Sequence, residues 1–405
     1  MSFTSRRRFM EFAGSTLATL GLNSVHLLPK FDRYGKVLAQ STPRKLALLV
    51  GINQYKNDPL NGCVNDVLMQ QMLLIHRFGF NPKDIVILTD KQATRQGILE
   101  AFEEHLVKQA KPGDVAVFHY SGHGSRVLDP NPIIGKSPIV DGTGLNGTFV
   151  PVDSSLPAGY PNVGGVVNDI MGHTLFLLMS AIQTENFTAV LDSCFSGLKT
   201  RDFKVRSRDG GEKIEISPQE KAYQQQWLSR LDLSPDEFVQ GYKTGVAKGV
   251  VLASAQPNQT AKDVKILDFY VGIFSYLLTQ YLWQNTGTPE NAISYTNAQI
   301  PRNLTQNPLY EVKIESGYEN DPMYFVQNQN PVANAVVMKT EGNQAQIWLG
   351  GLTIKQKAEL KSGTILNPVN SQPNSSGKAI FQSRTGLVGI ARIQGNLEVG
   401  TLLSL

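Results

Sequence analysis

The sequence predicts an α/β protein in which helices cover both faces of a mostly parallel sheet, followed by a small all-β domain. The run 45–52 is almost continuously apolar, which is typical of a strand buried on both faces of a parallel sheet. Segments with apolar residues at helical spacing alternate with further runs of this kind. After residue 331 the pattern changes to short strand candidates between Gly, Asn, Ser and Pro turns, which favours a barrel or sandwich.

Strands and helices are expected in alternating order along the first part of the chain. Apolar runs predict strands over 45–52, 84–88, 115–120, 187–191 and 249–255. Apolar residues at helical spacing predict helices over 64–78, 94–106, 169–182, 272–284 and 294–304. In the last part, short strands are predicted over 335–338, 345–349, 364–366, 378–381 and 387–393, with one helix over 355–360. The function of this all-β domain, 331–405, is not indicated by its sequence.

The first residues read as an export signal rather than as part of the fold. Arg6, Arg7 and Arg8 match the twin-arginine pattern, and a weakly apolar segment follows over 12–22. We therefore expect a signal peptide over 1–39 and export to a bacterial periplasm or equivalent lumen. The alternative is a basic, disordered N-terminus on a cytoplasmic protein. The apolar segment is too short to anchor the chain in a bilayer, so no membrane span is expected in the mature chain.

The composition is ordinary for a globular protein and excludes some function classes. The 405 residues carry a formal net charge of only +4, without a basic stripe, so nucleic acid is not an expected partner. The two cysteines cannot build a disulfide framework, and we expect both thiols to be free. No Cys/His spacing suits zinc.

A cysteine and a histidine each follow a predicted strand. Cys194 comes shortly after the strand 187–191, and His123 lies between two glycines after the strand 115–120. Because parallel strands end at one edge of a sheet, a thiol and an imidazole can meet there, as nucleophilic cysteine catalysis requires. A lone cysteine can also be a small buried hydrophobe. His119, inside its strand, better suits a structural role.

These motifs resemble those of a known peptidase family. Tyr120-Ser-Gly-His-Gly124 and Asp192-Ser-Cys-Phe-Ser-Gly197 are similar to the two motifs of caspase-type cysteine peptidases, most of all metacaspases and bacterial orthocaspases. The resemblance covers 46–304; Phe195 stands where metacaspases often carry histidine. It implies a caspase-like three-layer sandwich over 43–330 and a cysteine endopeptidase with a His123–Cys194 dyad. The backbone N–H groups of Gly124 and Cys194 would form the oxyanion hole.

The resemblance also implies a preference for basic substrates. Cys63 and Asp66, within Gly62-Cys-Val-Asn-Asp66, match the metacaspase segment that lines the pocket for the residue before the cleaved bond, with Ser121 and Asp192 as further contacts. Two carboxylates at the base of a pocket favour Arg, then Lys, and repel Asp. Alternatively, Asp66 only stabilises a helix N-terminus, and Asp192 is a surface turn carboxylate.

The segment that follows the second motif is expected to be a processing loop. In the family such a loop, here 199–248, separates a large part, 43–198, from a small part, 249–330. Basic residues are frequent at its start, and its apolar content is low, so we expect a solvated loop. A peptidase specific for basic residues would find its own substrate there, so we hypothesise self-cleavage.

Other expectations follow from the same resemblance. The chemistry needs no cofactor, but many metacaspases use calcium as an activator, and Asp141, Asp169 and Asp202 are the candidate ligands. Protein or peptide substrates are the expected partners, and the chain is expected to be a monomer. The main alternative is a catalytically inactive caspase-like scaffold; another is a related hydrolase acting on non-peptide acyl groups or with a different specificity.

Overall fold

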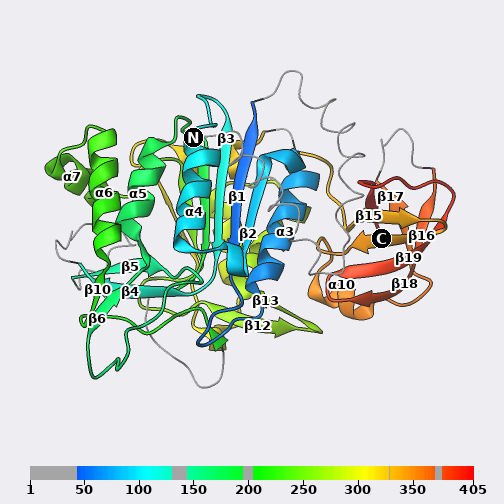
Figure 1. Cartoon of the computed structure of the whole chain (residues 1–405). Coiled ribbons are helices and arrows are strands. Elements are labelled where there is room, and N and C mark those ends of the chain that lie inside the picture. The colour runs from blue at the N-terminus through cyan, green and yellow to red at the C-terminus, as the bar shows by residue number, and fades with distance from the viewer. Residues whose placement is uncertain (1–42, 130–143, 195–203, 328, 370–375) are drawn as a thin grey trace.

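A computed structural model describes residues 43–129, 144–194, 204–327, 329–369 and 376–405. Its centre is a six-stranded sheet in the order β14-β11-β8-β3-β1-β2 (Figure 1). Five strands are parallel, and only β14 at one edge runs antiparallel to β11. The strands are β1 (Lys45–Gly51), β2 (Ile85–Thr89), β3 (Val115–Ser121), β8 (Phe187–Asp192), β11 (Val250–Ala253) and β14 (Leu309–Val312).

Helices cover both faces of this sheet. Successive side chains of a strand point to opposite faces, and on these strands both faces are apolar. Along β1, Leu46 and Leu48 belong to one hydrophobic core, and Ala47 and Leu49 to the other. One core is closed by α3 (Cys63–His76), α8 (Ile273–Gln284) and α9 (Pro289–Gln299). The other is closed by α4 (Arg95–Ala101), its π-helical continuation η5 (Phe102–Val107) and α5 (Gly172–Ala181). The predicted α/β class with a mostly parallel sheet is confirmed.

Short turns of 3₁₀ helix connect these elements at η3 (Pro82–Asp84), η4 (Asp90–Gln92), η6 (Arg302–Leu304), η7 (Tyr318–Asn320) and η8 (Met323–Phe325). The predicted last helix, 294–304, begins earlier, as α9 over Pro289–Gln299. Thr288 caps it in a capping box with Asn291, and Pro289 occupies its first turn, which together favour this start.

A small insertion lies at the far end of the molecule from the C-terminus (Figure 1). In the sequence, its segments lie between the sheet strands β3 and β11. It contains β4 (Gly124–Leu128), β5 (Leu145–Phe149), β6 (Gly165–Val167), β7 (Ile170–Met171) and β10 (Ile214–Ile216). Two helices follow, α6 (Pro218–Arg230) and α7 (Pro235–Thr244). The predicted solvated loop 199–248 is therefore largely structured where it is described, because Ser217 and Ser234 cap these helices and Trp227 and Phe238 bury against α5.

A hairpin missed by the sequence analysis lies between the sheet and the C-terminal domain. It consists of β12 (Lys262–Ile266) and β13 (Phe269–Gly272). The short strand β9 (Lys204–Val205) pairs antiparallel with β12, so that Val205 lies opposite Lys262. Residues from the predicted processing loop thus form the third strand of a small sheet.

The C-terminal domain is a closed six-stranded barrel (Figure 1). Its elements are β15 (Ala335–Glu341), β16 (Gln344–Trp348), α10 (Ile354–Glu359), β17 (Ile365–Pro368), β18 (Lys378–Thr385), β19 (Val388–Gln394) and β20 (Leu402–Ser404). Side chains such as Val337, Ile347 and Phe381 fill its interior. On its outside, Trp348 and Leu387 join the hydrophobic core of α8, so the barrel packs directly on the sheet domain.

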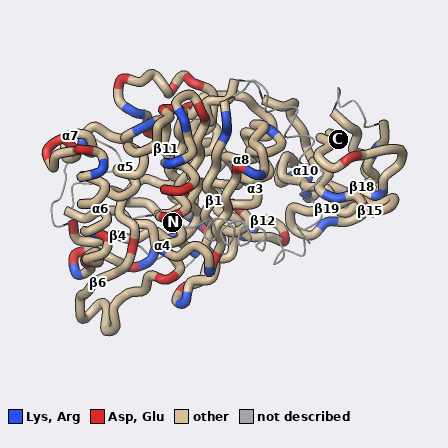
Figure 2. Tube along the Cα trace, turned by 45° about the horizontal axis from the view of Figure 1, so that its top comes forward, with Lys and Arg blue, Asp and Glu red and all other residues tan. Residues whose placement is uncertain are grey.

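Charged residues of both signs are interspersed along the described trace (Figure 2). Within the described ranges, no helix combines the length and the apolar character that crossing a bilayer requires.

Candidate active site

His123 and Cys194 lie at the same edge of the sheet. β3 and β8 are adjacent and parallel, with Ser121 opposite Asp192 at their last paired position. His123 and Cys194 each follow that pair by two residues, and both side chains are almost fully buried. The predicted meeting of the two strand ends therefore corresponds to the register of the sheet.

The histidine has a defined hydrogen-bonding state. His123 Nε2 lies 2.7 Å from the carbonyl oxygen of Asp58, and since a carbonyl can only accept, Nε2 carries the hydrogen. Nδ1 then bears the lone pair, and no described residue bonds to it. The Tyr55 ring lies 4.5 Å from the imidazole, and its hydroxyl accepts a bond from the His123 backbone N–H. Burial lowers the pKa of His123 to about 4, so the ring is a neutral proton acceptor at neutral pH.

The thiol is also neutral in this arrangement. Burial raises the pKa of Cys194 to about 11, because a thiolate is poorly solvated there. Cys63, the other cysteine, is buried and free as well. At neutral pH the side chains are therefore a protonated thiol at Cys194 and a neutral imidazole at His123.

The carbonyl of Arg206 lies at the centre of this site. Its oxygen accepts hydrogen bonds from the backbone N–H groups of Gly124, at 3.0 Å, and of Cys194, at 3.1 Å. These are the two donors that the resemblance assigned to an oxyanion hole. The N–H of Arg206 donates to the carbonyl of Ala261 at 3.0 Å, continuing the pairing of β9 with β12. The segment therefore lies in the site as an extended strand.

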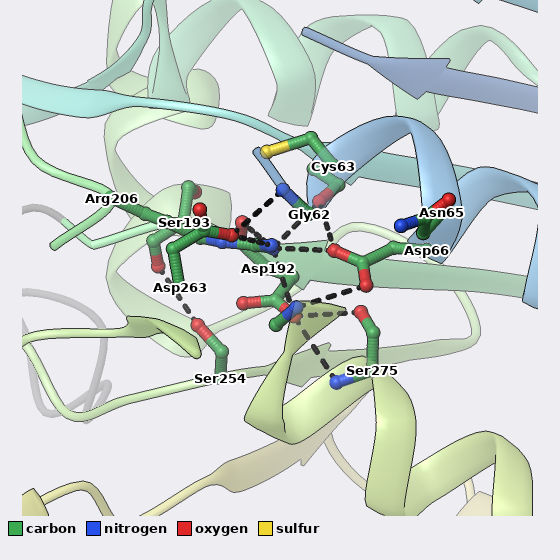
Figure 3. Close-up of polar contacts among 12 residues, drawn as sticks. Gly62, Cys63, Asn65, Asp66, Asp192, Ser193, Arg206, Ser254, Asp263 and Ser275 are labelled. Carbon is green, nitrogen blue, oxygen red and sulfur yellow. Dashed lines mark hydrogen bonds and ion pairs between the residues drawn. The ribbon is translucent and has the colours of Figure 1, made fainter. Parts of the chain in front are cut away.

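The Arg206 side chain is surrounded by three carboxylates (Figure 3). Nη1 lies 2.7 Å from Asp66 Oδ2 and 3.1 Å from Asp192 Oδ2, and Nη2 lies 3.0 Å from Asp263 Oδ1. Nη1 also donates to Ser121 Oγ at 2.6 Å. All four ionic side chains are fully buried. The pocket is therefore shaped for a planar guanidinium with donors on several sides.

Separate elements hold these carboxylates in place. Asp192 Oδ2, at the end of β8, accepts from both the N–H and the hydroxyl of Ser275 on α8. Asp263, on β12, accepts from the backbone N–H groups of Asn61 and Gly62. Asp66, on α3, accepts from the N–H of Gly272 at 3.0 Å. The pocket thus exists only when the sheet, α3, α8 and the hairpin are packed together.

Gly272 sits against the guanidinium and cannot easily be larger. A Cβ at this position would lie 2.2 Å from Asp192 Oδ2 and 2.5 Å from Arg206 Nη1, which is closer than side chains tolerate. Because Gly272 has no side chain, β13 leaves space at this position, and the Arg206 guanidinium fills it.

The three acids carry more charge than one arginine neutralises. Burial raises the pKa of Asp66 to about 7, Asp192 adds to this effect, and Arg206 opposes it. Burial alone would lower the pKa of Arg206, but the surrounding acids raise it well above its usual range. The expectation of a solvated segment is thus wrong at Arg206, because these ion pairs compensate for burying its charge.

The structure gathers Asp66, Ser121 and Asp192 around one guanidinium, with Cys63 beside them in the same close-up (Figure 3). The sequence analysis missed Asp263, which no pattern in its charged surroundings distinguishes. It also missed Asp58, whose backbone oxygen binds His123. Arg206 itself was visible only as one of several basic residues in a segment expected to be cut.

The described part of the structure does not bring the candidate calcium ligands together. Asp141 and Asp202 lie outside the described ranges. Asp169 is fully buried, accepts from Thr148 and Ser154, and is ion-paired with Arg208 at 2.6 Å. Within the described ranges no group of three or more His, Cys, Asp or Glu side chains could hold a metal. This donor set does not fit calcium while Arg208 is in place, and we assign no step to the ion.

Comparisons with known proteins point to metacaspases. A family model described as the metacaspase, peptidase C14 domain, matches residues 45–201. Metacaspase-1 of Yarrowia lipolytica is 38% identical over 164 residues, covering 38% of this chain and 32% of that protein. Metacaspase-1 of Schizosaccharomyces pombe is 28% identical over 308 residues, covering 66% of this chain and 68% of that protein. The chain thus spans about a third of the Yarrowia protein's length and about two thirds of the S. pombe protein's.

Two solved structures resemble the chain loosely. A crystal structure of a Geobacter sulfurreducens protein covers 71% of this chain and all of its own, with 18% identity and a TM-score of 0.47. Caspase-1 from Spodoptera frugiperda covers 67% of this chain and 87% of its own, with 10% identity and a TM-score of 0.37. Both TM-scores lie below 0.5, so the assignment rests on the sequence matches.

The fold is a mostly parallel α/β sheet in which two adjacent strand ends carry the motifs that resemble those of caspase-type peptidases. Over residues 45–201 the chain is similar to the metacaspase, peptidase C14 domain, and the two relatives named above are metacaspases. The matched model is that of a peptidase domain.

Proposed function

We propose that the protein is a cysteine endopeptidase that cleaves after Arg and, less efficiently, after Lys, with His123 and Cys194 as its dyad. The observation that carries this proposal is the position of Arg206. Its guanidinium binds three buried acids while its carbonyl accepts hydrogen bonds from the N–H groups of Gly124 and Cys194. A substrate arginine in the same position would present its carbonyl carbon to the dyad.

The chemistry follows from the two protonation states. Cys194 Sγ attacks the substrate carbonyl carbon while His123 Nδ1 accepts the thiol proton. The oxyanion is stabilised by the N–H groups of Gly124 and Cys194, and loss of one such donor typically costs about 3 kcal/mol of barrier. His123 then gives its proton to the leaving amine as the C–N bond breaks. Water hydrolyses the thioester, which releases the carboxylate product and restores the thiol.

Specificity is proposed to come from the three-acid pocket. An arginine can donate to Asp66, Asp192 and Asp263 at once because its guanidinium is a planar fork, whereas a lysine ammonium is a single point of charge. An aspartate would meet three like charges and be rejected. The pocket thus favours Arg over Lys and both strongly over Asp.

The same contacts support self-cleavage between Arg206 and Ser207. In the predicted processing loop, Arg206 is the residue whose side chain fills the pocket and whose carbonyl faces the two N–H donors. Until the bond is cut and the segment leaves, it blocks access for other substrates. Both dyad residues are correspondingly buried.

The proposed activity is tested with internally quenched peptides that carry Arg, Lys or Asp before the cleaved bond. Processed wild type should cleave Arg peptides best, Lys peptides less and Asp peptides not at all, and Cys194→Ala should be inactive. Ser196 is not a member of the proposed dyad, so Ser196→Ala is the matched control and should keep activity. No turnover of any peptide by the wild type would instead favour an inactive scaffold.

Export and activation remain proposals of their own. We propose that residues 1–39 direct twin-arginine export, which predicts a mature periplasmic protein whose export is lost in Arg6→Lys/Arg7→Lys/Arg8→Lys. Since Asp169 does not fit calcium while Arg208 is paired with it, we propose calcium only as an activator that binds after this segment has left the site. Addition of calcium after chelator treatment should then raise the rate of peptide cleavage. An unchanged rate would show that calcium is not an activator.

A further inference from the structure

We propose that the cleft has a second basic subsite, in which Asp169, Thr148 and Ser154 bind an arginine located two residues after the cleaved bond. This inference rests on the proposed peptidase function and extends it to the far side of the scissile bond. Its occupant in the structure is Arg208, two residues after Arg206.

The backbone beyond Arg206 is held along β4 as a substrate would be. Ser207 forms a parallel bridge with Gly124, and the N–H of Arg208 donates to the carbonyl of Gly124 at 2.8 Å. Further along, the N–H of Gly211 donates to the carbonyl of Arg126 at 2.9 Å. Gly124 thus binds both sides of the scissile bond: its N–H contacts the Arg206 carbonyl and its carbonyl contacts Arg208.

With the backbone in this register, the Arg208 side chain lies in a polar site formed by Asp169, Thr148 and Ser154. Arg208 Nη2 lies 2.6 Å from Asp169 Oδ2, and Nη1 donates to Ser154 Oγ at 3.3 Å. Asp169 is fully buried, and Thr148 and Ser154 each donate to it at 2.6 Å. These two hydroxyl groups hold the carboxylate in position, and its buried negative charge needs a cation in the cleft.

The site is separate from the pocket of Arg206. Asp169 immediately precedes β7, Thr148 lies on β5, and Ser154 follows β5, all in the insertion rather than on the hairpin. The side chain of Arg208 is 12% exposed, so this subsite is open at its edge. Substrates of the form Arg-Xaa-Arg, cut after the first arginine, would fill both acidic sites at once.

The test compares two quenched peptides that differ only at the second residue after the cut. Processed wild type should cleave the sequence Val-Arg-Ser-Arg with a kcat/KM about tenfold to a hundredfold above that for Val-Arg-Ser-Gln, the range expected for a hydrogen bond to a charged group. Glu at that position should be cleaved more slowly still. Equal rates for the Arg and Gln peptides would overturn the subsite while leaving the peptidase proposal intact. No cleavage of either would refute the peptidase proposal and this one with it.

A variant locates the effect on the enzyme. Asp169→Asn should bring the ratio of the two rates close to one while keeping the requirement for arginine before the cut. Glu212→Gln, an exposed carboxylate nearby, is the control and should keep the wild-type ratio. An unchanged ratio in Asp169→Asn would contradict the assignment. Since the ratio in the wild type is decisive by itself, poor folding of Asp169→Asn does not leave the proposal untested.

Discussion

Two arginines of one short segment meet acidic sites of different strength. Arg206 is fully buried among Asp66, Asp192 and Asp263, whereas Arg208 meets the single carboxylate of Asp169 and is 12% exposed at its side chain. The first site is assembled from four elements of the fold, and the second lies in the insertion.

This difference gives the two sites different roles: the first selects which peptides are cut, and the second changes the rate at which they are cut. A cation that three buried acids require cannot be omitted without leaving uncompensated charge, so the first pocket decides whether a peptide is cut. A single, partly open ion pair contributes less, because water can replace part of it. The second site should therefore modulate the rate among peptides that the first has accepted.

The largest effect is expected from Arg206→Gln. Removing the guanidinium leaves three buried carboxylates unpaired, and breaking a buried pair costs about 3–5 kcal/mol, so cleavage after residue 206 should slow at least about a hundredfold. Gel analysis of the chain over time measures this rate. Lys204→Gln is the control, since the Lys204 ammonium lies 3.9 Å from Asp58, a long contact, and is not part of the three-acid pocket. Cleavage of both variants at the wild-type rate would contradict the account.

Next in size is the effect of Asp263→Asn on arginine peptides. Its carboxylate pairs with the guanidinium at 3.0 Å, and we expect KM to rise about tenfold or more with little change in kcat, as for loss of a bond to a charged group. Steady-state kinetics of the processed enzyme separates the two constants. The exposed Asp236→Asn should leave both unchanged. A fall in kcat at constant KM would place Asp263 in another role.

The pH dependence of KM tests the charge balance of the first pocket. Burial raises the pKa of Asp66 to about 7, so its carboxylate is charged above that pH and protonated below it. The value of about 7 applies with an arginine in the pocket, and since that arginine lowers the pKa, Asp66 has a higher pKa in the empty pocket. Because the charged form attracts arginine, KM for arginine peptides should rise as pH falls toward about 7 from above. In Asp66→Asn this dependence should largely disappear and KM should be high throughout. A KM that is constant between pH 9.5 and pH 7 in the wild type would show that Asp66 does not titrate there.

A smaller effect is expected from Arg208→Gln in the intact chain. Cleavage after Arg206 should slow about tenfold, less than in Arg206→Gln, because one ion pair is lost rather than three. Lys213→Gln, an exposed residue of the same segment, provides the comparison and should be cut normally. If Arg208→Gln slowed cleavage as strongly as Arg206→Gln, the ranking of the two sites would be wrong.

The smallest effect is expected where the barrel meets the hairpin. Asp268, in the turn between β12 and β13, is paired with Arg384 and accepts from the N–H of Gly386 at 2.8 Å. Because this ion pair is partly exposed, Asp268→Ala should raise KM only about twofold to fivefold, through looser placement of Asp263. Lys339→Ala, which removes a barrel ion pair away from the hairpin, is the matched variant. An equal change in both would argue against a specific role for this contact.

The fold was largely predictable because its strands are buried on both faces. Continuous apolar runs such as 45–52 predict strands regardless of the segments around them. The two strands that end at the motifs, β3 and β8, are neighbours in the sheet. The hairpin 262–272 was not predictable, since Lys262 and Asp263 are polar residues buried by tertiary ion pairs and hydrogen bonds rather than by an apolar pattern. The helix predicted from residue 169 begins instead at Gly172, after Asp169 has turned inward to bind Thr148 and Ser154.

The candidate site was predictable only in part, for a related reason. Asp66 and Asp192 could be selected through motifs, but a carboxylate such as Asp263 enters the pocket from a distant segment that carries no motif. The burial of Arg206 could not be anticipated from a segment rich in charge and poor in apolar residues. Three acids from separate elements compensate for its desolvation, and that arrangement exists only after folding.

The central claim is that Arg206 occupies its own enzyme's cleft as a substrate does. N-terminal sequencing together with intact mass measurement of wild type and Cys194→Ala tests it most directly. We predict a new N-terminus at Ser207 and a fragment ending at Arg206 in the wild type, and neither in Cys194→Ala. Identical uncut chains in both proteins, or cleavage elsewhere with the bond between Arg206 and Ser207 intact, would contradict it.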